Sequence, residues 1–184
     1  MDEQKNPWTR LSEKKIYENP WIRLDEHQVI NPSGGTGIYG KVSFKNKAIG
    51  ILPIDDAGNT WLVGQYRYTL DLYSWEIPMG GVPLADSTEE GALRELKEET
   101  GLIAKKLEHL CTIHTSNSVT DEVGDVFVAT GLVEEQPEFD ETEELMIKKV
   151  AFKEALAWVM EGKITDSLSV AAILKYARMM EQNG

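Results

Sequence analysis

Residues 80–102 read GGVPLADSTEEGALRELKEETGL, and the local chemistry of this stretch predicts one well-bounded helix. Ser87, with Glu90 three residues later, has the pattern of a capping box, in which side chains bond to the unpaired backbone donors of the first helical turn. Gly101 is suited to the left-handed conformation that ends many helices. We therefore expect a helix over residues 88–100.

The glutamates of this helix share one face, because positions three and four residues apart are neighbours on a helix. They are Glu95, Glu98 and Glu99. Arg94 precedes Glu98 by four residues and is expected to neutralise it. Glu95 and Glu99 then remain for a hard divalent cation, which prefers carboxylate oxygens. For a helix of this composition taken alone, a solvated acidic face is the alternative.

A strand and a glycine loop are expected before the helix, since residues 75–80 read WEIPMG and lead through Asp86 to the helix start. This order resembles the signature of the Nudix hydrolase family, which is glycine, five residues, glutamate, seven residues, then Arg-Glu-apolar-any-Glu-Glu-any-Gly-apolar. The matching residues are Gly80, Arg94, Glu95, Leu96, Glu98, Glu99, Gly101 and Leu102. Asp86 stands where the family usually has glutamate, and its shorter side chain favours an orienting role over direct metal ligation.

The resemblance implies a fold and a metal site. The fold is an α/β/α sandwich of Nudix type, with a mixed sheet and an N-terminal antiparallel β appendage. The implied metal ligands are Glu95, Glu99 and the backbone carbonyl of Met79, and the implied ion is Mg²⁺ or Mn²⁺. Glu98 would complete the site or hold Arg94, and both are assigned to the catalytic group.

A second motif narrows the resemblance. QYR at residues 65–67, followed by WEIPMGG at residues 75–81, is similar to the Nudix branch that cleaves ADP-ribose and related nucleoside diphosphate sugars. In that branch the arginine and the glutamate of the Trp-Glu pair contact substrate, which nominates Arg67 and Glu76. The planar guanidinium of Arg67 suits paired phosphate oxygens. The implied reaction is attack of water at phosphorus, which produces a nucleoside monophosphate and a sugar phosphate.

Two acidic loops complete the predicted site. Residues 134–144, EEQPEFDETEE, read by composition as a solvated loop. The resemblance nevertheless places a general base and a metal-assisting acid in such a loop, at Glu141 and Glu143, and a loop residue can enter a site once substrate is bound. The earlier loop SNSVTDEV carries a substrate-contact role at Glu122. The choice of general base between Glu141 and the acidic pair of Asp121 and Glu122 remains open.

The first 45 residues read as a small antiparallel β element, with strands over residues 14–30 and 37–44 and the turn NPSGG between them. Such an element cannot bury a core alone. We therefore divide the chain into an N-terminal element, 1–45, and a catalytic domain, 46–184. Trp21 either packs within the element or stacks on a substrate base. We expect a homodimer, because the family branch often exchanges this element across a two-fold axis.

The composition and net charge of the chain bear on which kinds of partner it can bind. The 184 residues are 41% hydrophobic and 27% charged, which is ordinary for a globular protein. The net charge of −12 argues against binding to the phosphate backbone of nucleic acid. The start of the chain, MDEQKNPWTR, has no apolar signal-peptide core, and no apolar run is long enough to span a membrane. We therefore expect a cytoplasmic protein without a membrane or nucleic-acid partner.

The expected function is metal-dependent hydrolysis of a nucleoside diphosphate sugar such as ADP-ribose. One alternative is a Nudix hydrolase of another substrate, such as a dinucleoside polyphosphate or coenzyme A. Another is a non-catalytic sensor that binds a sugar nucleotide. Loss of Glu95, Glu99 or the acidic loop would favour the sensor, and all of them are present. No motif in the sequence names the base or the sugar.

Overall fold

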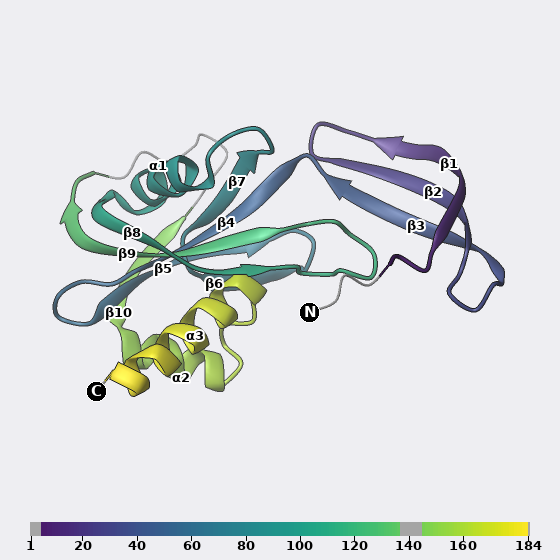
Figure 1. Ribbon diagram of the computed structural model, residues 1–184. Helices are drawn as coiled ribbons and strands as arrows, with labels where there is room; N and C mark the ends of the chain where they lie inside the picture. Colours follow the sequence, from purple (N-terminus) through teal and green to yellow (C-terminus); the bar gives the residue numbers. More distant parts are fainter. Residues whose placement is uncertain (1–4, 137–144, 184) are drawn as a thin grey trace. The chain divides into compact units, whose positions relative to one another are not determined.

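The computed structural model describes residues 5–136 and 145–183, which form two compact units (Figure 1). The first unit runs to Asn46 and includes His114–Glu122. The second consists of Lys47–Ile113 and of the chain from Val123 onward. The loop 114–122, predicted as part of the catalytic domain, clusters with the N-terminal strands.

The first unit is a sheet of three antiparallel strands in the order β1-β2-β3. The strands are β1 (Thr9–Glu18), β2 (Ile22–Ile30) and β3 (Thr36–Phe44). Asn31 closes the turn between β2 and β3, because its Oδ1 accepts hydrogen bonds from the backbone N–H groups of Ser33 and Gly35, each at 3.0 Å. The antiparallel strands predicted here are confirmed, and β1 begins earlier than expected.

Asp121 holds the loop 114–122 against β3. Its carboxylate accepts hydrogen bonds from Ser43 Oγ at 2.8 Å and from the backbone N–H of Phe44 at 3.0 Å, and Lys41 Nζ lies 2.8 Å away. Burial alone would raise the pKa of Asp121, but the bonds from Lys41, Ser43 and Phe44 lower it below its ordinary value. These contacts explain why the loop belongs to the first unit.

Two sheets form the centre of the second unit, and their strand orders are β7-β4-β9-β8 and β10-β5-β6. The first of these sheets is mixed, because β4 runs parallel to β9 whereas β8 and β9 are antiparallel. The strands are β4 (Asn46–Pro53), β5 (Asn59–Arg67), β6 (Leu72–Glu76), β7 (Met79–Pro83), β8 (Leu102–Ile113), β9 (Gly124–Glu134) and β10 (Met146–Ala151).

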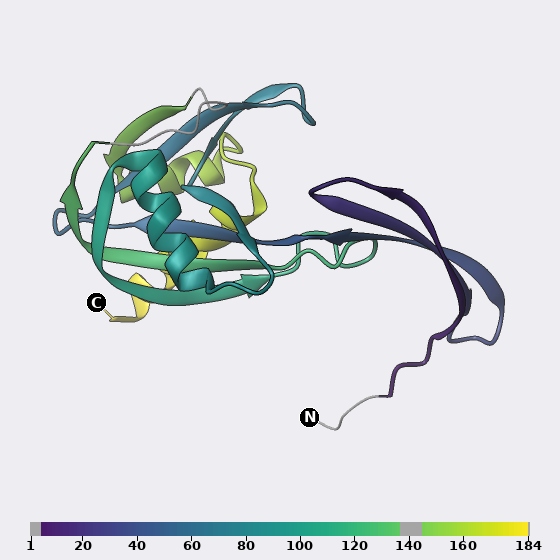
Figure 2. The ribbon, with the colours of Figure 1, turned by 90° about the horizontal axis from the view of Figure 1, so that it is seen from above.

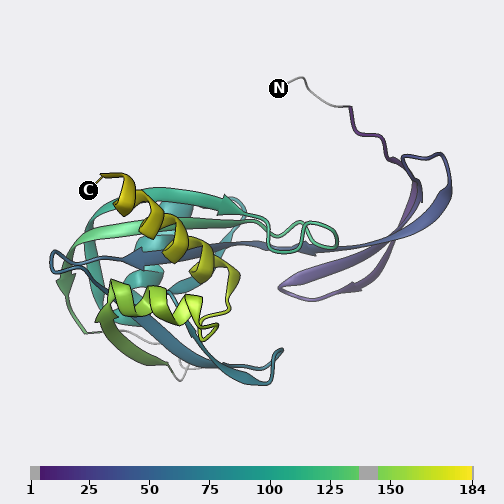
Figure 3. The same cartoon turned by 90° about the horizontal axis from the view of Figure 1, so that it is seen from below.

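Helices cover both faces of this unit. They are α1 (Thr88–Thr100), α2 (Phe152–Met160) and α3 (Ser167–Asn183). Helix α1 lies in front when the unit is seen from above (Figure 2), and α2 and α3 lie in front when it is seen from below (Figure 3). This arrangement confirms the predicted α/β/α sandwich. Across residues 5–136 and 145–183, no helix has the length and apolar character needed to cross a membrane.

Strand β4 is buried on both of its faces, as expected for a central strand covered by helices on either side. Ile49 and Ile51 belong to the core cluster that includes Leu96 of α1. Leu52 belongs to a second cluster that includes Ile173 of α3. All five side chains are fully buried, so the two cores fix α1 and α3 on opposite sides of the sheet.

Candidate active site

The candidate site is built around the point where the chain passes from one sheet to the other. β6 ends at Glu76 in the sheet β10-β5-β6, and β7 begins at Met79 in the mixed sheet. Ile77 and Pro78 join the two. The carbonyl of Pro78 accepts a hydrogen bond from the N–H of Ile51 on β4 at 2.8 Å. We call residues 76–79 the crossing segment.

Helix α1 begins and ends where the sequence predicts. Ser87 Oγ accepts a hydrogen bond from the N–H of Glu90 at 3.3 Å. Gly101 has φ of 70°, in the left-handed region, and its N–H bonds to the carbonyl of Lys97 at 2.8 Å. Both ends of the helix are thus determined by local contacts.

Gly80 allows the carboxylate of Glu95 to lie directly against β7. A Cβ atom at position 80 would stand 2.2 Å from Cδ of Glu95, which is far inside contact distance. Gly91 plays a similar part for the helix itself, because a Cβ there would meet Cγ2 of Val82 at 2.2 Å. Gly80 lies within strand β7, which neighbours β4 in the mixed sheet, so the prediction of a glycine loop at this place is wrong.

Glu99 connects the helix to the crossing segment. Only 3% of its surface is exposed, and its Oε2 accepts a hydrogen bond from the N–H of Met79 at 2.9 Å. A buried carboxylate requires such a partner. Glu95 and Glu99 stand four residues apart on α1, and both carboxylates meet the first residues of β7.

Arg94 contacts two glutamates of α1 instead of one. Its Nη1 lies 2.8 Å from Oε2 of Glu98, as expected, and its Nη2 lies 2.7 Å from Oε1 of Glu95. The prediction that Arg94 pairs with Glu98 and not with Glu95 is therefore wrong. The physical reason is that the guanidinium fork presents separate nitrogens to separate carboxylates. Because a carboxylate offers about four acceptor directions, the ion pair is compatible with metal ligation by Glu95.

Arg67 and Glu76, both nominated as substrate contacts, are bonded to each other. Nε of Arg67 donates to the two carboxylate oxygens of Glu76 at 2.9 and 3.1 Å, and Nη2 donates to Glu76 as well. Only 3% of Glu76 is exposed. The hydrogen bond to Glu76 raises the pKa of Arg67 above its ordinary value, and the charges of Asp166 and Glu99 add to this effect.

Comparison with known families accounts for nearly the whole chain. The profile described as the NUDIX domain matches residues 45–167. The chain belongs to the Nudix family. A second profile, described as the nucleoside diphosphate sugar hydrolase N-terminal domain, matches residues 8–42. The protein is therefore a Nudix hydrolase whose first unit is also of a recognised type, and the predicted resemblance to this family is confirmed.

Individual relatives agree with the family profiles. The chain is 36% identical over 136 residues to an ADP-ribose pyrophosphatase of Bacillus subtilis, with 73% of each chain covered. It is 32% identical over 167 residues to an ADP-ribose pyrophosphatase of Mycobacterium tuberculosis, which covers 89% of this chain and 80% of the relative. A crystal structure of an ADP compounds hydrolase superposes with a TM-score of 0.87 at 21% identity and covers 100% of this chain and 99% of the other. That likeness shows the fold.

Hydrolases of the Nudix family generally need a divalent metal ion. Across the described ranges, no three His, Cys, Asp or Glu side chains gather into a group that would hold one. Glu95 and Glu99 do supply paired carboxylates at the start of β7, and Gly80 provides the space for one of them. This donor set of oxygens fits a hard divalent cation.

The other predicted site residues belong to the first unit or lie outside the part of the chain that the structure describes. Trp21 and Glu122 lie in the first unit. Trp21 is 67% exposed, and the carboxylate of Glu122 accepts a hydrogen bond from Thr115 Oγ1. Their substrate-binding roles stay predictions. Glu141 and Glu143 lie outside the described residues, so their assigned roles rest on the sequence resemblance.

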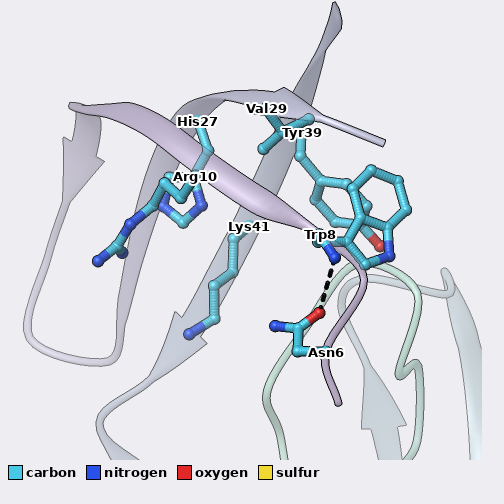
Figure 4. Close-up of a pocket in the computed structure, with 7 residues that line it drawn as sticks. All are labelled: Asn6, Trp8, Arg10, His27, Val29, Tyr39 and Lys41. Atoms are coloured by element: carbon cyan, nitrogen blue, oxygen red, sulfur yellow. Dashed lines mark hydrogen bonds between the residues drawn. The ribbon is translucent and has the colours of Figure 1, made fainter. Parts of the chain in front are cut away.

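The first unit contains a pocket of about 520 Å³ (Figure 4). It is lined by Asn6, Trp8, Arg10, His27, Val29, Tyr39 and Lys41. Trp8 packs edge-on against Tyr39, with ring centroids 5.5 Å apart. Arg10 pairs with Glu13 at 2.6 Å, and Lys41 pairs with Asp121 at 2.8 Å. Since both of these cations already have carboxylate partners, we assign no ligand to the pocket.

Sequence reasoning missed a contact from α3 to the crossing segment. Ser169 is fully buried, and its Oγ accepts a hydrogen bond from the N–H of Ile77 at 3.0 Å. Asp166 caps the start of α3, because its Oδ1 accepts a hydrogen bond from the N–H of Ser169 at 2.7 Å. The spacing of Asp166 and Ser169 resembles that of a capping box. This local pattern does not predict the hydrogen bond from Ile77, which is more than 90 residues away in the sequence.

Proposed function

We propose that this Nudix hydrolase cleaves the diphosphate of a nucleoside diphosphate sugar, and that ADP-ribose is a substrate. The observation that carries the proposal is the proximity of two kinds of group along the crossing segment. Arg67, suited to phosphate, is bonded to Glu76 at the start of the segment, and Glu99 is bonded to Met79 at its end. The profile match of the first unit and the names of the relatives support the same substrate class.

The chemistry of a diphosphate diester explains the use of each group. Such a substrate carries two negative charges and repels hydroxide. Glu95, Glu99 and the backbone carbonyl of Met79 would hold Mg²⁺ or Mn²⁺, which neutralises phosphate charge and activates water. Arg67 would bind phosphate oxygens through its planar fork. Water then adds its oxygen to one phosphorus, the bridging P–O bond breaks, and a nucleoside monophosphate and a sugar phosphate leave.

The proton of the attacking water requires a base. We assign this role to Glu141 and a metal-assisting role to Glu143, on the strength of the resemblance. Glu122 is the alternative base, and the structure shows that its carboxylate is hydrogen-bonded by Thr115. A general base has to come within about 2.6–3.2 Å of the water oxygen in the substrate complex.

The first unit is proposed to join two copies of the chain. Several of its large apolar side chains are exposed, at 55% for Leu11, 48% for Ile16, 67% for Trp21 and 65% for Ile38. A second copy would remove this surface from water. Light scattering at micromolar concentration should therefore give twice the chain mass of 20.7 kDa. A mass of one chain would contradict the dimer.

A substrate panel tests the proposed activity. Purified protein is incubated with Mg²⁺ or Mn²⁺ and with ADP-ribose, a UDP-sugar, a dinucleoside polyphosphate or coenzyme A, and products are separated by chromatography. We expect the highest kcat/KM for a nucleoside diphosphate sugar and expect AMP and ribose 5-phosphate from ADP-ribose. A higher kcat/KM for the dinucleoside polyphosphate or for coenzyme A would instead assign the protein to a Nudix activity on that substrate. Binding of ADP-ribose without turnover would identify a sensor.

A further inference from the structure

The acceptor for the backbone N–H of Ile77 lies on helix α3 and not on a neighbouring strand. The pairing of β5 with β6 ends at Val63 and Glu76, so Ile77 lies beyond the last pair of that ladder. Ile77 is fully buried, and its N–H donates to Ser169 Oγ at 3.0 Å. A buried N–H without a partner is unfavourable, so this contact is the one that satisfies the middle of the crossing segment.

Ser169 is itself held in place by Asp166. The hydroxyl of Ser169 donates to Oδ1 of Asp166 at 2.7 Å, and the same oxygen accepts from the backbone N–H of Ser169. The hydroxyl proton is therefore directed at Asp166, and a lone pair of Ser169 Oγ is left to receive Ile77. The orientation that Ile77 requires is thus set by the first turn of α3.

Each residue of the crossing segment is held by a different part of the second unit. Glu76 is bonded to Arg67 of β5, Ile77 to Ser169 of α3, Pro78 to Ile51 of β4 and Met79 to Glu99 of α1. The charge of Asp166 also contributes to the raised pKa of Arg67, so the start of α3 lies within electrostatic range of that guanidinium.

We infer that Ser169, oriented by Asp166, is a positioning residue that sets the spacing between the arginine–glutamate pair at the start of the crossing segment and the metal-binding carboxylates at its end. Arg67 and Glu76 lie on one side of Ile77, and Met79 and Glu99 lie on the other. A shift of Ile77 changes the geometry of both. The kinetic part of this inference rests on the proposed function, whereas its structural part does not.

Ser169→Ala tests the inference, because it removes the acceptor of Ile77 and adds no bulk. Amide exchange followed by NMR should show faster exchange at Ile77 and Met79, by about tenfold or more, because loss of this hydrogen bond favours local opening. Mn²⁺ affinity, measured by titration without substrate, should fall about tenfold, at the lower end of the range for groups that orient metal ligands. With substrate, kcat should fall and the Mg²⁺ concentration needed for half-maximal rate should rise.

Two variants on the same helix serve as controls. Ser167→Ala removes an exposed serine hydroxyl two residues away. Lys175→Gly weakens α3 at an exposed position through helix propensity alone. The inference is overturned if Ser169→Ala matches Ser167→Ala within twofold in Met79 exchange and Mn²⁺ affinity, or if Lys175→Gly produces the same changes. If the wild-type protein binds Mn²⁺ but cleaves no nucleotide sugar, the proposed function is refuted. Met79 amide exchange and Mn²⁺ affinity would still test the positioning role of Ser169, because neither measurement requires turnover.

Discussion

The carboxylate of Glu99 accepts a hydrogen bond from the N–H of Met79 at 2.9 Å, and this bond joins the glutamate helix to the strand on which it packs. Only 3% of Glu99 is exposed. A carboxylate in such a place has lost most of its hydration, so it is stabilised by hydrogen bonds and by nearby cations. Its position at the start of β7 agrees with the metal-binding role that the family resemblance implies for it.

Glu99→Gln should abolish most activity while the fold persists. Glutamine has the same shape and keeps an acceptor for the N–H of Met79, but it lacks the charge that a divalent cation requires. We expect turnover to fall by more than about 10- to 100-fold, the range for groups that only orient metal ligands. Circular dichroism and a substrate assay at saturating Mg²⁺ check the result. Near wild-type turnover would remove Glu99 from the site.

Gly80→Ala should displace Glu95. The added Cβ would stand 2.2 Å from Cδ of Glu95, so the carboxylate has to leave its place against β7. We expect weaker metal binding in a titration and a loss of stability of about 1–3 kcal/mol, as for other overpacked sites. Gly40→Ala is the matched control, because a Cβ at position 40 meets nothing within 4 Å. Equal metal affinity in the two variants would contradict the close approach.

The boundaries of α1 could be predicted from sequence because Ser87 and Gly101 act on their immediate neighbours. The family signature likewise nominated Glu95 and Glu99, and both lie beside β7. The placement of Gly80 in a strand could not be predicted, since it depends on pairing with β4, which is distant in sequence. Non-local contacts of this kind carry no local pattern.

Several side-chain contacts around the site also could not be predicted from the sequence. The spacing of Arg94 and Glu98 indicates their ion pair, but the second contact of Arg94 with Glu95 depends on the rotamer of the guanidinium. The bond from Ile77 to Ser169 joins segments 92 residues apart, and it is visible only in the folded chain.

Arg67→Lys should weaken substrate binding while it preserves the fold. Lysine retains the charge that neutralises Glu76 but loses the paired donors that match phosphate oxygens. We expect KM to rise about tenfold, equivalent to one charge-assisted hydrogen bond, with little change in melting temperature. Arg67→Ala would additionally leave the buried Glu76 unpaired and should lower stability by about 1–3 kcal/mol. If Arg67→Lys leaves KM unchanged, Arg67 serves only as the partner of Glu76.

Glu141→Gln should lower turnover by about 10²–10⁴, the usual contribution of a positioned proton acceptor. Substrate and Mg²⁺ affinity should change little, because a loop base adds little to the resting fold. Glu143→Gln should instead raise the Mg²⁺ requirement, since its proposed partner is a cation. Rate measurements across a Mg²⁺ series distinguish the two. Full turnover in Glu141→Gln together with inactivity in Glu122→Gln would assign the base to the earlier loop.

Hydrolysis of ADP-ribose in ¹⁸O-labelled water tests the central claim most directly. Mass spectrometry of the products with Mg²⁺ present should show one ¹⁸O atom in the phosphate group of either AMP or ribose 5-phosphate, and Glu99→Gln should form neither product at a comparable rate. Products without label in a phosphate, or the absence of cleavage with both Mg²⁺ and Mn²⁺, would contradict metal-dependent attack of water at phosphorus by this protein.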